Sequence, residues 1–211
     1  MELEFIGAAQ TVTGSMHLLR TKAGNILLDC GLFQGTRREA NERNRRLHVP
    51  LRDLKAVVLS HAHIDHSGAL PLLFKQGYTG PVFTTPATRS LATVMLRDAA
   101  AIQDSDARHL NKIAKKEGSD EVVEPLYDDE DVVRAIERTV AVPYHTTLPI
   151  LSGVELTFYD AGHVLGSAVT VLEVTEGSKR VRLGFTGDLG RAERPILRDP
   201  EVPEGLDALI T

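Results

Sequence analysis

The sequence predicts an α/β fold, and three observations indicate it. Short apolar runs rich in Val, Ile and Leu alternate with segments of helical periodicity. Turn and cap residues such as Gly24, Gly77 and Pro86 stand at the boundaries between these segments. With 211 residues, 42% of them hydrophobic, the chain can bury one sizeable core. We therefore expect a globular chain of one domain, or at most two.

The expected elements of the N-terminal half begin with a strand at 3–7. Strands at 16–21 and 25–29 form a hairpin closed by Ala23-Gly24. The buried strand 55–60 (KAVVLS) leads into a His-rich turn and then into a helix that contains Leu70, Leu73 and Phe74 and ends near Gly77. After a strand at 81–85, Pro86 opens a further helix, because proline suits the first helical turn.

The C-terminal half starts with a polar and mostly helical stretch over 101–140. Acidic residues at 128–131 favour the N-terminus of a helix over 132–138, where the helix dipole stabilises negative charge. Strands then return at 154–159, 169–174 and 181–185, and a last short apolar run over 208–211 completes the pattern.

Composition argues against several classes of protein. No apolar run approaches the roughly 18 to 20 residues that a membrane-spanning helix needs. The first thirty residues also lack the basic and apolar regions of a secretory signal. The single cysteine, Cys30, allows no intrachain disulfide and favours a reducing compartment, so we expect a cytoplasmic protein. Because no residue near Cys30 would activate it, we expect a small buried side chain.

Charge argues against one mode of nucleic-acid binding and leaves another open. The net charge of −5 disfavours a protein that coats nucleic acid through many phosphate contacts. One basic stretch, interrupted by Glu39 and Glu42, is still a candidate for local contact with phosphates, although most such runs are solvated helix faces. Its members are Arg37, Arg38, Arg43, Arg45 and Arg46.

The strongest chemical signal is the run His61-Ala62-His63-Ile64-Asp65-His66, directly after the strand 55–60. Four metal-ligand side chains in six residues are far denser than eight histidines in 211 residues would give by accident. In an extended turn, His61 and His63 would converge on one ion while Asp65 and His66 turn toward a second. Imidazole and carboxylate together suit zinc, with manganese or iron as alternatives.

Three further polar residues follow predicted strands. His163 stands after the strand 154–159, Asp188 after the strand 181–185, and Asp29 at the end of NILLD. Sites in α/β sheets form at the carboxyl ends of strands, so these side chains should join the His-rich turn. Metal-bound histidines usually donate their second N–H to a carboxylate, and we assign that supporting role to Asp29, with turn capping as the alternative.

Such a set of ligands is suited to a two-metal hydrolase. Two ions about 3.5 to 4 Å apart can hold a hydroxide between them and clamp the oxygens of a phosphate. Other hydrolytic patterns are missing from the sequence: G-x-S-x-G, H-E-x-x-H, the P-loop and C-x-x-C.

The run HAHIDH resembles the H-x-H-x-D-H motif of the metallo-β-lactamase superfamily. Four flanking stretches are similar to the β-CASP branch, whose members include the RNA 3′-processing endonuclease of the cleavage and polyadenylation machinery. These stretches are GAAQTVTGS at 7–15, LLDCGLFQG around Asp29, AGHVLGSA around His163 and FTGDLGR around Asp188. The resemblance implies a metallo-β-lactamase fold, an αββα sandwich of mixed sheets flanked by helices.

The same resemblance implies roles for individual residues. His61, His63 and His163 would hold one zinc, while Asp65, His66 and Asp188 would hold a second, with Asp188 bridging the two ions. Asp65 and Asp188 would then be the catalytic carboxylates. The implied activity is hydrolysis of RNA by a hydroxide activated by two Zn²⁺, through endonucleolytic cuts and also 5′ exonucleolytic trimming. Candidate RNA contacts are Arg37, Arg38, Arg45 and Arg46.

The resemblance also carries an expectation about domains. Residues 1–211 would be the N-terminal portion of a metallo-β-lactamase domain that is incomplete at its C-terminus. A β-CASP domain and a closing segment with two further histidines would follow Thr211.

Two other functions stay open. A different hydrolase on the same fold, such as a thioesterase or a lactamase, would use the same ligands, because a fold does not select a substrate. An inactive scaffold that binds RNA is the third alternative. RNA is the expected partner, no membrane is expected, and a homo-oligomer is compatible with the sequence.

Overall fold

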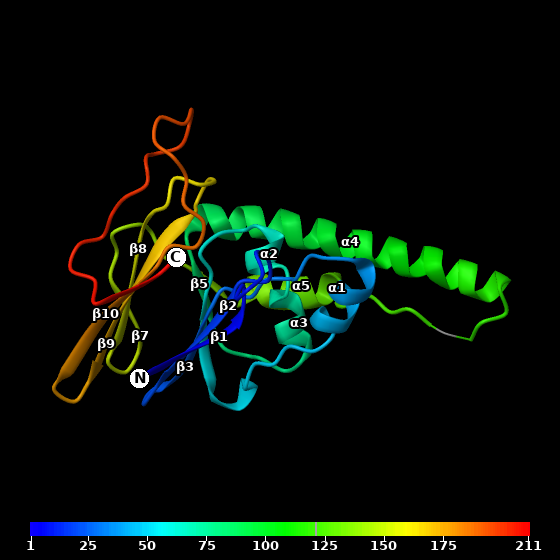
Figure 1. Cartoon of the computed structure of the whole chain (residues 1–211), viewed down its shortest axis with the longest axis horizontal. Coiled ribbons are helices and arrows are strands. Elements are labelled where there is room, and N and C mark those ends of the chain that lie inside the picture. Colours follow the sequence, from blue (N-terminus) through cyan, green and yellow to red (C-terminus); the bar gives the residue numbers. More distant parts are fainter. Residues whose placement is uncertain (121) are drawn as a thin grey trace.

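A computed structural model describes residues 1–120 and 122–211, without the side chains of Arg37 and Arg38. Two β-sheets pack face to face, with the described helices beyond the first sheet (Figure 1). The six-stranded first sheet has the order β1 (Glu2–Gly7), β2 (Met16–Thr21), β3 (Gly24–Leu28), β4 (Leu54–Val58), β5 (Val82–Thr84) and β6 (Thr139–Ala141). The five-stranded second sheet has the order β11 (Ala208–Ile210), β10 (Lys179–Phe185), β9 (Ala168–Glu176), β8 (Val154–Asp160) and β7 (Leu148–Leu151).

The central strands of the first sheet, β2 to β5, are buried on both faces. Strands β1, β2 and β3 pair antiparallel, whereas β3 to β6 pair parallel, and parallel strands need cover on both sides. Side chains alternate accordingly along the strands. Leu18, Leu27 and Val57 pack toward the helices. Leu19 and Ile26 pack toward the second sheet.

The second sheet has one apolar face and one polar face. Strands β7 to β10 pair antiparallel and β11 joins β10 in parallel. Leu156, Phe158 and Leu172 are buried against the first sheet. Glu155 and Arg180 are exposed on the opposite face. Within the described residues no helix covers that face, so the layers present are helix, sheet and sheet of the expected αββα sandwich.

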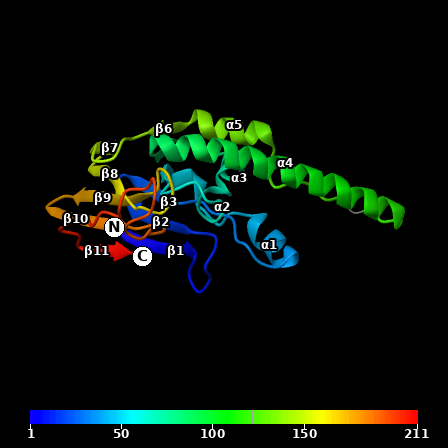
Figure 2. The ribbon, with the colours of Figure 1, turned by 90° about the horizontal axis from the view of Figure 1, so that it is seen from above.

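The helices pack on the first sheet and on one another. They are α1 (Arg37–Asn44), α2 (Ile64–Ser67), α3 (Leu70–Lys75), α4 (Pro86–Lys116) and α5 (Asp129–Glu137), with a 3₁₀ turn at Leu51–Asp53. Seen from above, α4 runs on well past the other elements (Figure 2). Its buried side chains end at Ala107, and the last turns carry mainly polar residues together with Leu110 and Ile113. Asp128 and Asp131 form a capping box at the start of α5, as the acidic run at 128–131 predicted.

The sequence missed two short strands. The predicted helical stretch 101–140 ends inside β6, which spans Thr139–Ala141, and no element was predicted for 148–151, which form β7. Both lie at sheet edges. β6 has three residues, and β7 contains Pro149, which an edge strand tolerates because one side of its backbone needs no partner. Neither strand shows the long apolar run that identified the others.

Among the described residues, no helix is both long enough and apolar enough to cross a bilayer. The longest helix, α4, has five buried residues, and charged and polar residues recur along its length.

Replacement of a side chain between the sheets should be costly. We expect Leu156→Ala to lower the free energy of unfolding by about 2 to 5 kcal/mol, because the side chain is fully buried and a cavity would remain. Leu209→Ala is the control, since Leu209 is 54% exposed. Urea denaturation measures both. Equal losses in the two variants would contradict a tightly packed core at Leu156.

Candidate metal centre

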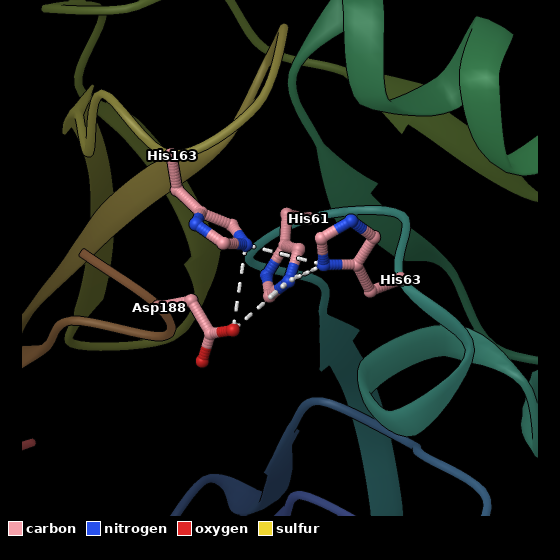
Figure 3. Close-up of side chains that lie close together, drawn as sticks. All are labelled: His61, His63, His163 and Asp188. Atoms are coloured by element: carbon pink, nitrogen blue, oxygen red, sulfur yellow. Dashed lines mark hydrogen bonds and ion pairs between the residues drawn. The ribbon is translucent and has the colours of Figure 1, made fainter. Parts of the chain in front are cut away.

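The polar residues singled out in the sequence meet at one edge of the sandwich. The parallel strands β3 and β4 end there with Asp29 and the His-rich run. From the second sheet come His163 after β8 and Asp188 after β10, two strands that run in the same direction because each pairs antiparallel with β9. Figure 3 shows side chains from the two sheets turned toward one another. The ends of the strands therefore place the site, as the sequence predicted.

Four side chains form the centre of this group: His61, His63, His163 and Asp188. One ligand atom from each lies within 4.8 Å of all the others. Nδ1 of His63 is 3.1 Å from Nε2 of His61 and 3.2 Å from Nε2 of His163. Oδ2 of Asp188 is 3.4 Å from Nε2 of His163 and 3.8 Å from Nε2 of His61.

These separations fit a zinc ion. Four ligand atoms at zinc–nitrogen distances of about 2.0 to 2.1 Å in a tetrahedron lie roughly 3.3 to 3.4 Å from each other. Nδ1 of His63 carries at most one proton, so it cannot donate a hydrogen bond to both neighbouring ring nitrogens, whereas a metal ion would accept lone pairs from all three. Both the spacing and the chemistry of these donors therefore suit a metal ion.

A second group of donors adjoins the first through Asp188. The other oxygen of this carboxylate, Oδ1, is 3.3 Å from Nε2 of His66. Oδ2 of Asp65 is 4.0 Å from the same nitrogen. Asp188 thus faces His61 and His163 with one oxygen and His66 with the other.

The turn that carries these ligands is only partly extended. His61 and His63 lie in an extended loop as predicted, but Ile64 starts the helix α2, so Asp65 and His66 belong to a first helical turn. Gly31 allows this helix to come close, because a Cβ there would lie 1.7 Å from the backbone oxygen of Asp65. The direction of the Asp65 and His66 side chains is therefore set by a helical turn and not, as predicted, by an extended one.

Asp29 is fully buried beneath the ligands and makes four hydrogen bonds. One oxygen accepts the backbone N–H of Ser60 at 2.8 Å. The other accepts the Ser60 hydroxyl at 2.9 Å, the Ser15 hydroxyl at 3.3 Å and Nδ1–H of His66 at 2.6 Å. Because His66 donates through Nδ1, its Nε2 is left to face Asp188. This contact is the one predicted for Asp29.

Ser60 extends the influence of Asp29 to His61. Its hydroxyl donates to Asp29, so its oxygen is the acceptor for Nδ1–H of His61 at 3.0 Å. That tautomer leaves Nε2 of His61 free to act as a ligand. Ser60 and Ser15 lie inside the stretches KAVVLS and GAAQTVTGS, but nothing in the sequence predicted their contacts with Asp29.

The loop that carries His163 is fixed to the start of α4. The carbonyl oxygen of Gly166 accepts two buried hydrogen bonds, one from the hydroxyl of Thr85 at 2.7 Å and one from the hydroxyl of Thr88 at 2.8 Å. A Cβ on Gly166 would lie 2.4 Å from the backbone nitrogen of Thr88, so the close contact requires glycine. Oγ of Ser167 in turn accepts the backbone N–H of His163 at 3.0 Å. These contacts, also missed in the sequence, hold the loop in place.

Among the groups of the site with shifted pKa values, His61 and Asp188 are already in the form that binds a cation, whereas His66 must first lose a proton. Burial, assisted by nearby His66, lowers the pKa of His61 to about 3, so its imidazole is neutral and available as a ligand. Burial opposes protonation of His66, but hydrogen bonds with Asp188 and Asp29 outweigh it and raise the pKa of His66 to about 10. The hydrogen bond with His66 lowers the pKa of Asp188 to about 2.

Other predicted residues lie away from this centre. Cys30 is fully buried, as expected, and burial raises the pKa of its thiol. Arg45 and Arg46 are exposed at and beyond the end of α1. The backbone of Arg37 and Arg38 opens that helix, but their side chains lie outside the described part, so the structure places no contact for them.

Comparison with characterised proteins shows similarity along the whole chain. It is 37% identical to ribonuclease TTHA0252 of Thermus thermophilus, over all of this chain and 43% of that protein. It is 34% identical to the transcription termination factor FttA of Methanocaldococcus jannaschii, over 96% of this chain and 29% of that protein. The chain therefore spans less than half the length of either relative.

Solved structures support the fold. A metallo-β-lactamase of Cronobacter sakazakii aligns with a TM-score of 0.52 at 20% identity, over 90% of this chain and 61% of that one. The subclass B3 enzyme MEM-A1 from a soil metagenome library aligns with a TM-score of 0.51, over 87% and 59%. The family profile described as the metallo-beta-lactamase superfamily matches residues 10–210. With the fold and this match in agreement, the chain belongs to the metallo-β-lactamase superfamily.

Proposed function

We propose that this chain carries the metal centre of a ribonuclease of the β-CASP branch, which hydrolyses RNA phosphodiester bonds by endonucleolytic cuts and by 5′ exonucleolytic trimming. The observation that carries the proposal is the position of Asp188, whose two oxygens face two separate groups of ligands. That arrangement suits two ions rather than one. The relative named a ribonuclease supports RNA as the substrate.

The ligands divide between two ions, which we propose are Zn²⁺, with manganese or iron as alternatives. His61, His63 and His163 hold the first ion, and Asp65 and His66 hold the second. Asp188 bridges them. Neutral imidazoles with carboxylates and no thiolate match the preference of zinc and leave the other metals open.

Bound ions would lower the pKa of a water molecule and offset the charge that develops on the phosphate oxygens. The chain's own residues prepare the site for this reaction. Asp29 and Ser60 fix the tautomers of His66 and His61 so that both present Nε2. Asp65 and Asp188 are the carboxylates placed to touch the reacting groups, and Asp65 is half-buried beside the centre.

Two alternatives are distinguishable by experiment. A thioesterase or lactamase would load metal equally well but would hydrolyse a thioester or a β-lactam and spare RNA. A scaffold would bind RNA without cleaving it. Metal analysis of the natural protein that carries these residues, followed by assays with labelled RNA, a thioester and a β-lactam, separates the three.

Replacement of a proposed ligand should remove both metal and activity. We expect His63→Ala to lower metal content and to reduce RNA cleavage by more than about 100-fold. Loss of a residue that only supports a ligand typically costs about 10- to 100-fold, and loss of the ligand itself should cost more. The circular dichroism spectrum should persist, since His63 lies in a loop. His109→Ala, an exposed histidine of α4, is the control. Normal metal content with full cleavage in His63→Ala would refute the assignment.

The supporting carboxylate should matter less than a ligand. We expect Asp29→Asn to weaken metal binding and cleavage by about 10- to 100-fold, because the amide is a weaker acceptor for Nδ1–H of His66. Asp53→Asn, at an exposed position, should leave both unchanged. Titration with zinc and initial rates on labelled RNA give the two values. Undiminished affinity and rate in Asp29→Asn would indicate that Asp29 merely caps its turn.

The hydrogen bond from Thr88 to Gly166, which holds the His163 loop, should affect metal binding. We expect Thr88→Val to weaken metal binding by about fivefold, which corresponds to the roughly 1 kcal/mol of one lost hydrogen bond. Thr93→Val in the same helix is the matched control, since its hydroxyl bonds only to its own helix. Zinc titration of both variants tests the expectation, and identical affinities would show that the Gly166 contact does not position His163.

A further inference from the structure

A cavity of about 300 Å³ lies beside the metal centre, and none of the proposed metal ligands lines it. Its walls come from the β1–β2 loop, from Gly31 to Phe33, and from the end of α1 with the following turn. We name it the Arg46 pocket after one of its lining residues; the others used below are Phe33, Arg43, Asn44 and His48. Its volume is at the lower end of the range for small-molecule sites, so it can hold one small ligand.

The pocket shares a wall with the proposed second metal site. Gly14 and Gly31 both line it. Next to Gly14, the backbone N–H of Ser15 donates to the backbone oxygen of Asp65 at 2.8 Å, and Gly31 donates to Ser15 at 3.0 Å. The residues behind that wall are the helical turn with Asp65 and His66. A chain that occupied the pocket would therefore continue toward the metals.

The electrostatics of the pocket differ from those of the whole chain. Arg43, Arg46 and His48 line it, and the described residues of its lining include no carboxylate, although the chain has a net charge of −5. Glu39, one of the acids that interrupt the basic stretch, is held in the capping box of α1 by Thr36. The pocket is therefore a local site for an anion.

The pocket also offers a surface for a planar ring. The guanidinium carbon of Arg43 lies 4.2 Å from the centre of the Phe33 ring, so the two side chains hold each other in place. Buried Asn44 fixes the Phe33 backbone, accepting its N–H at 2.9 Å and donating to its carbonyl at 2.8 Å. Guanidinium planes and aromatic rings are the groups on which unpaired RNA bases stack.

From these observations we propose that the Arg46 pocket binds one nucleotide of the RNA strand next to the bond that is cut. Arg46 and His48 contact its phosphate, and the Phe33 and Arg43 pair stacks on its base. The inference rests on the proposed function, because it names where that substrate lies. It also separates the basic stretch into two parts, since Arg46 lines the pocket and the adjacent Arg45 does not.

The test compares neighbouring arginines in the natural metal-loaded protein. We expect Arg46→Gln to raise KM for a short single-stranded RNA several-fold with little change in kcat, because the pocket binds substrate without touching the reacting atoms. The log–log salt dependence of RNA binding should fall by about 0.7 for one lost single-strand contact. Arg45→Gln should change neither, and Arg46→Lys should restore the salt dependence.

A second variant probes the ring surface. Phe33→Leu should weaken RNA binding by about 5- to 100-fold while the salt dependence is kept, because stacking does not release counterions. Zinc content should match the wild type in every variant. If wild type cleaves RNA and the pocket variants behave as Arg45→Gln does, then the pocket proposal is wrong and the proposed function stands. If wild type neither binds nor cleaves RNA, then both are wrong.

Discussion

The buried carboxylate of Asp29 is the interaction on which the metal centre depends. It joins three separate segments: the start of β2 through Ser15, the end of β4 through Ser60, and α2 through His66. Its backbone adopts a left-handed conformation with φ of 58°, which Asp tolerates better than most residues. Without a negative group at this point, Ser60 and His66 would lose their common acceptor, and the orientation of ring nitrogens above it would no longer be fixed.

Much of the fold could be predicted from the sequence because its central strands are strongly apolar. The segments 16–21 and 55–60 have clear apolar patterns and lie between the helices and the second sheet, whereas 181–185 has one face against the core. The edge strands β6 and β7 were not predictable in this way, because β6 has only three residues and Pro149 interrupts the apolar residues of β7. A very short strand or a proline weakens the apolar pattern on which such predictions depend, even where Leu148 and Ile150 pack against the core.

The candidate site was predictable for a related reason. Histidine is an uncommon residue, so the three histidines and one aspartate of HAHIDH stand out in the sequence. The order of the strands then brings Asp29, His163 and Asp188 near this run. The residues that hold the ligands were not predictable in the same way. Serine and threonine hydroxyls are common in loops, and only the three-dimensional contacts of Ser60, Ser167 and Thr88 distinguish them from ordinary solvated side chains.

The division of the ligands between two sheets has a consequence during synthesis of the protein. Nδ1 of His63 and Nε2 of His163 are 3.2 Å apart in space but 100 residues apart along the chain. At translation rates of about 5 to 20 residues per second, the HAHIDH run would emerge roughly 5 to 20 seconds before His163. During that interval the nascent chain presents clustered imidazoles without the carboxylate bridge, a partial site open to whichever divalent ion is most abundant. The docking of the second sheet is then the step at which an early bound ion is either kept or replaced.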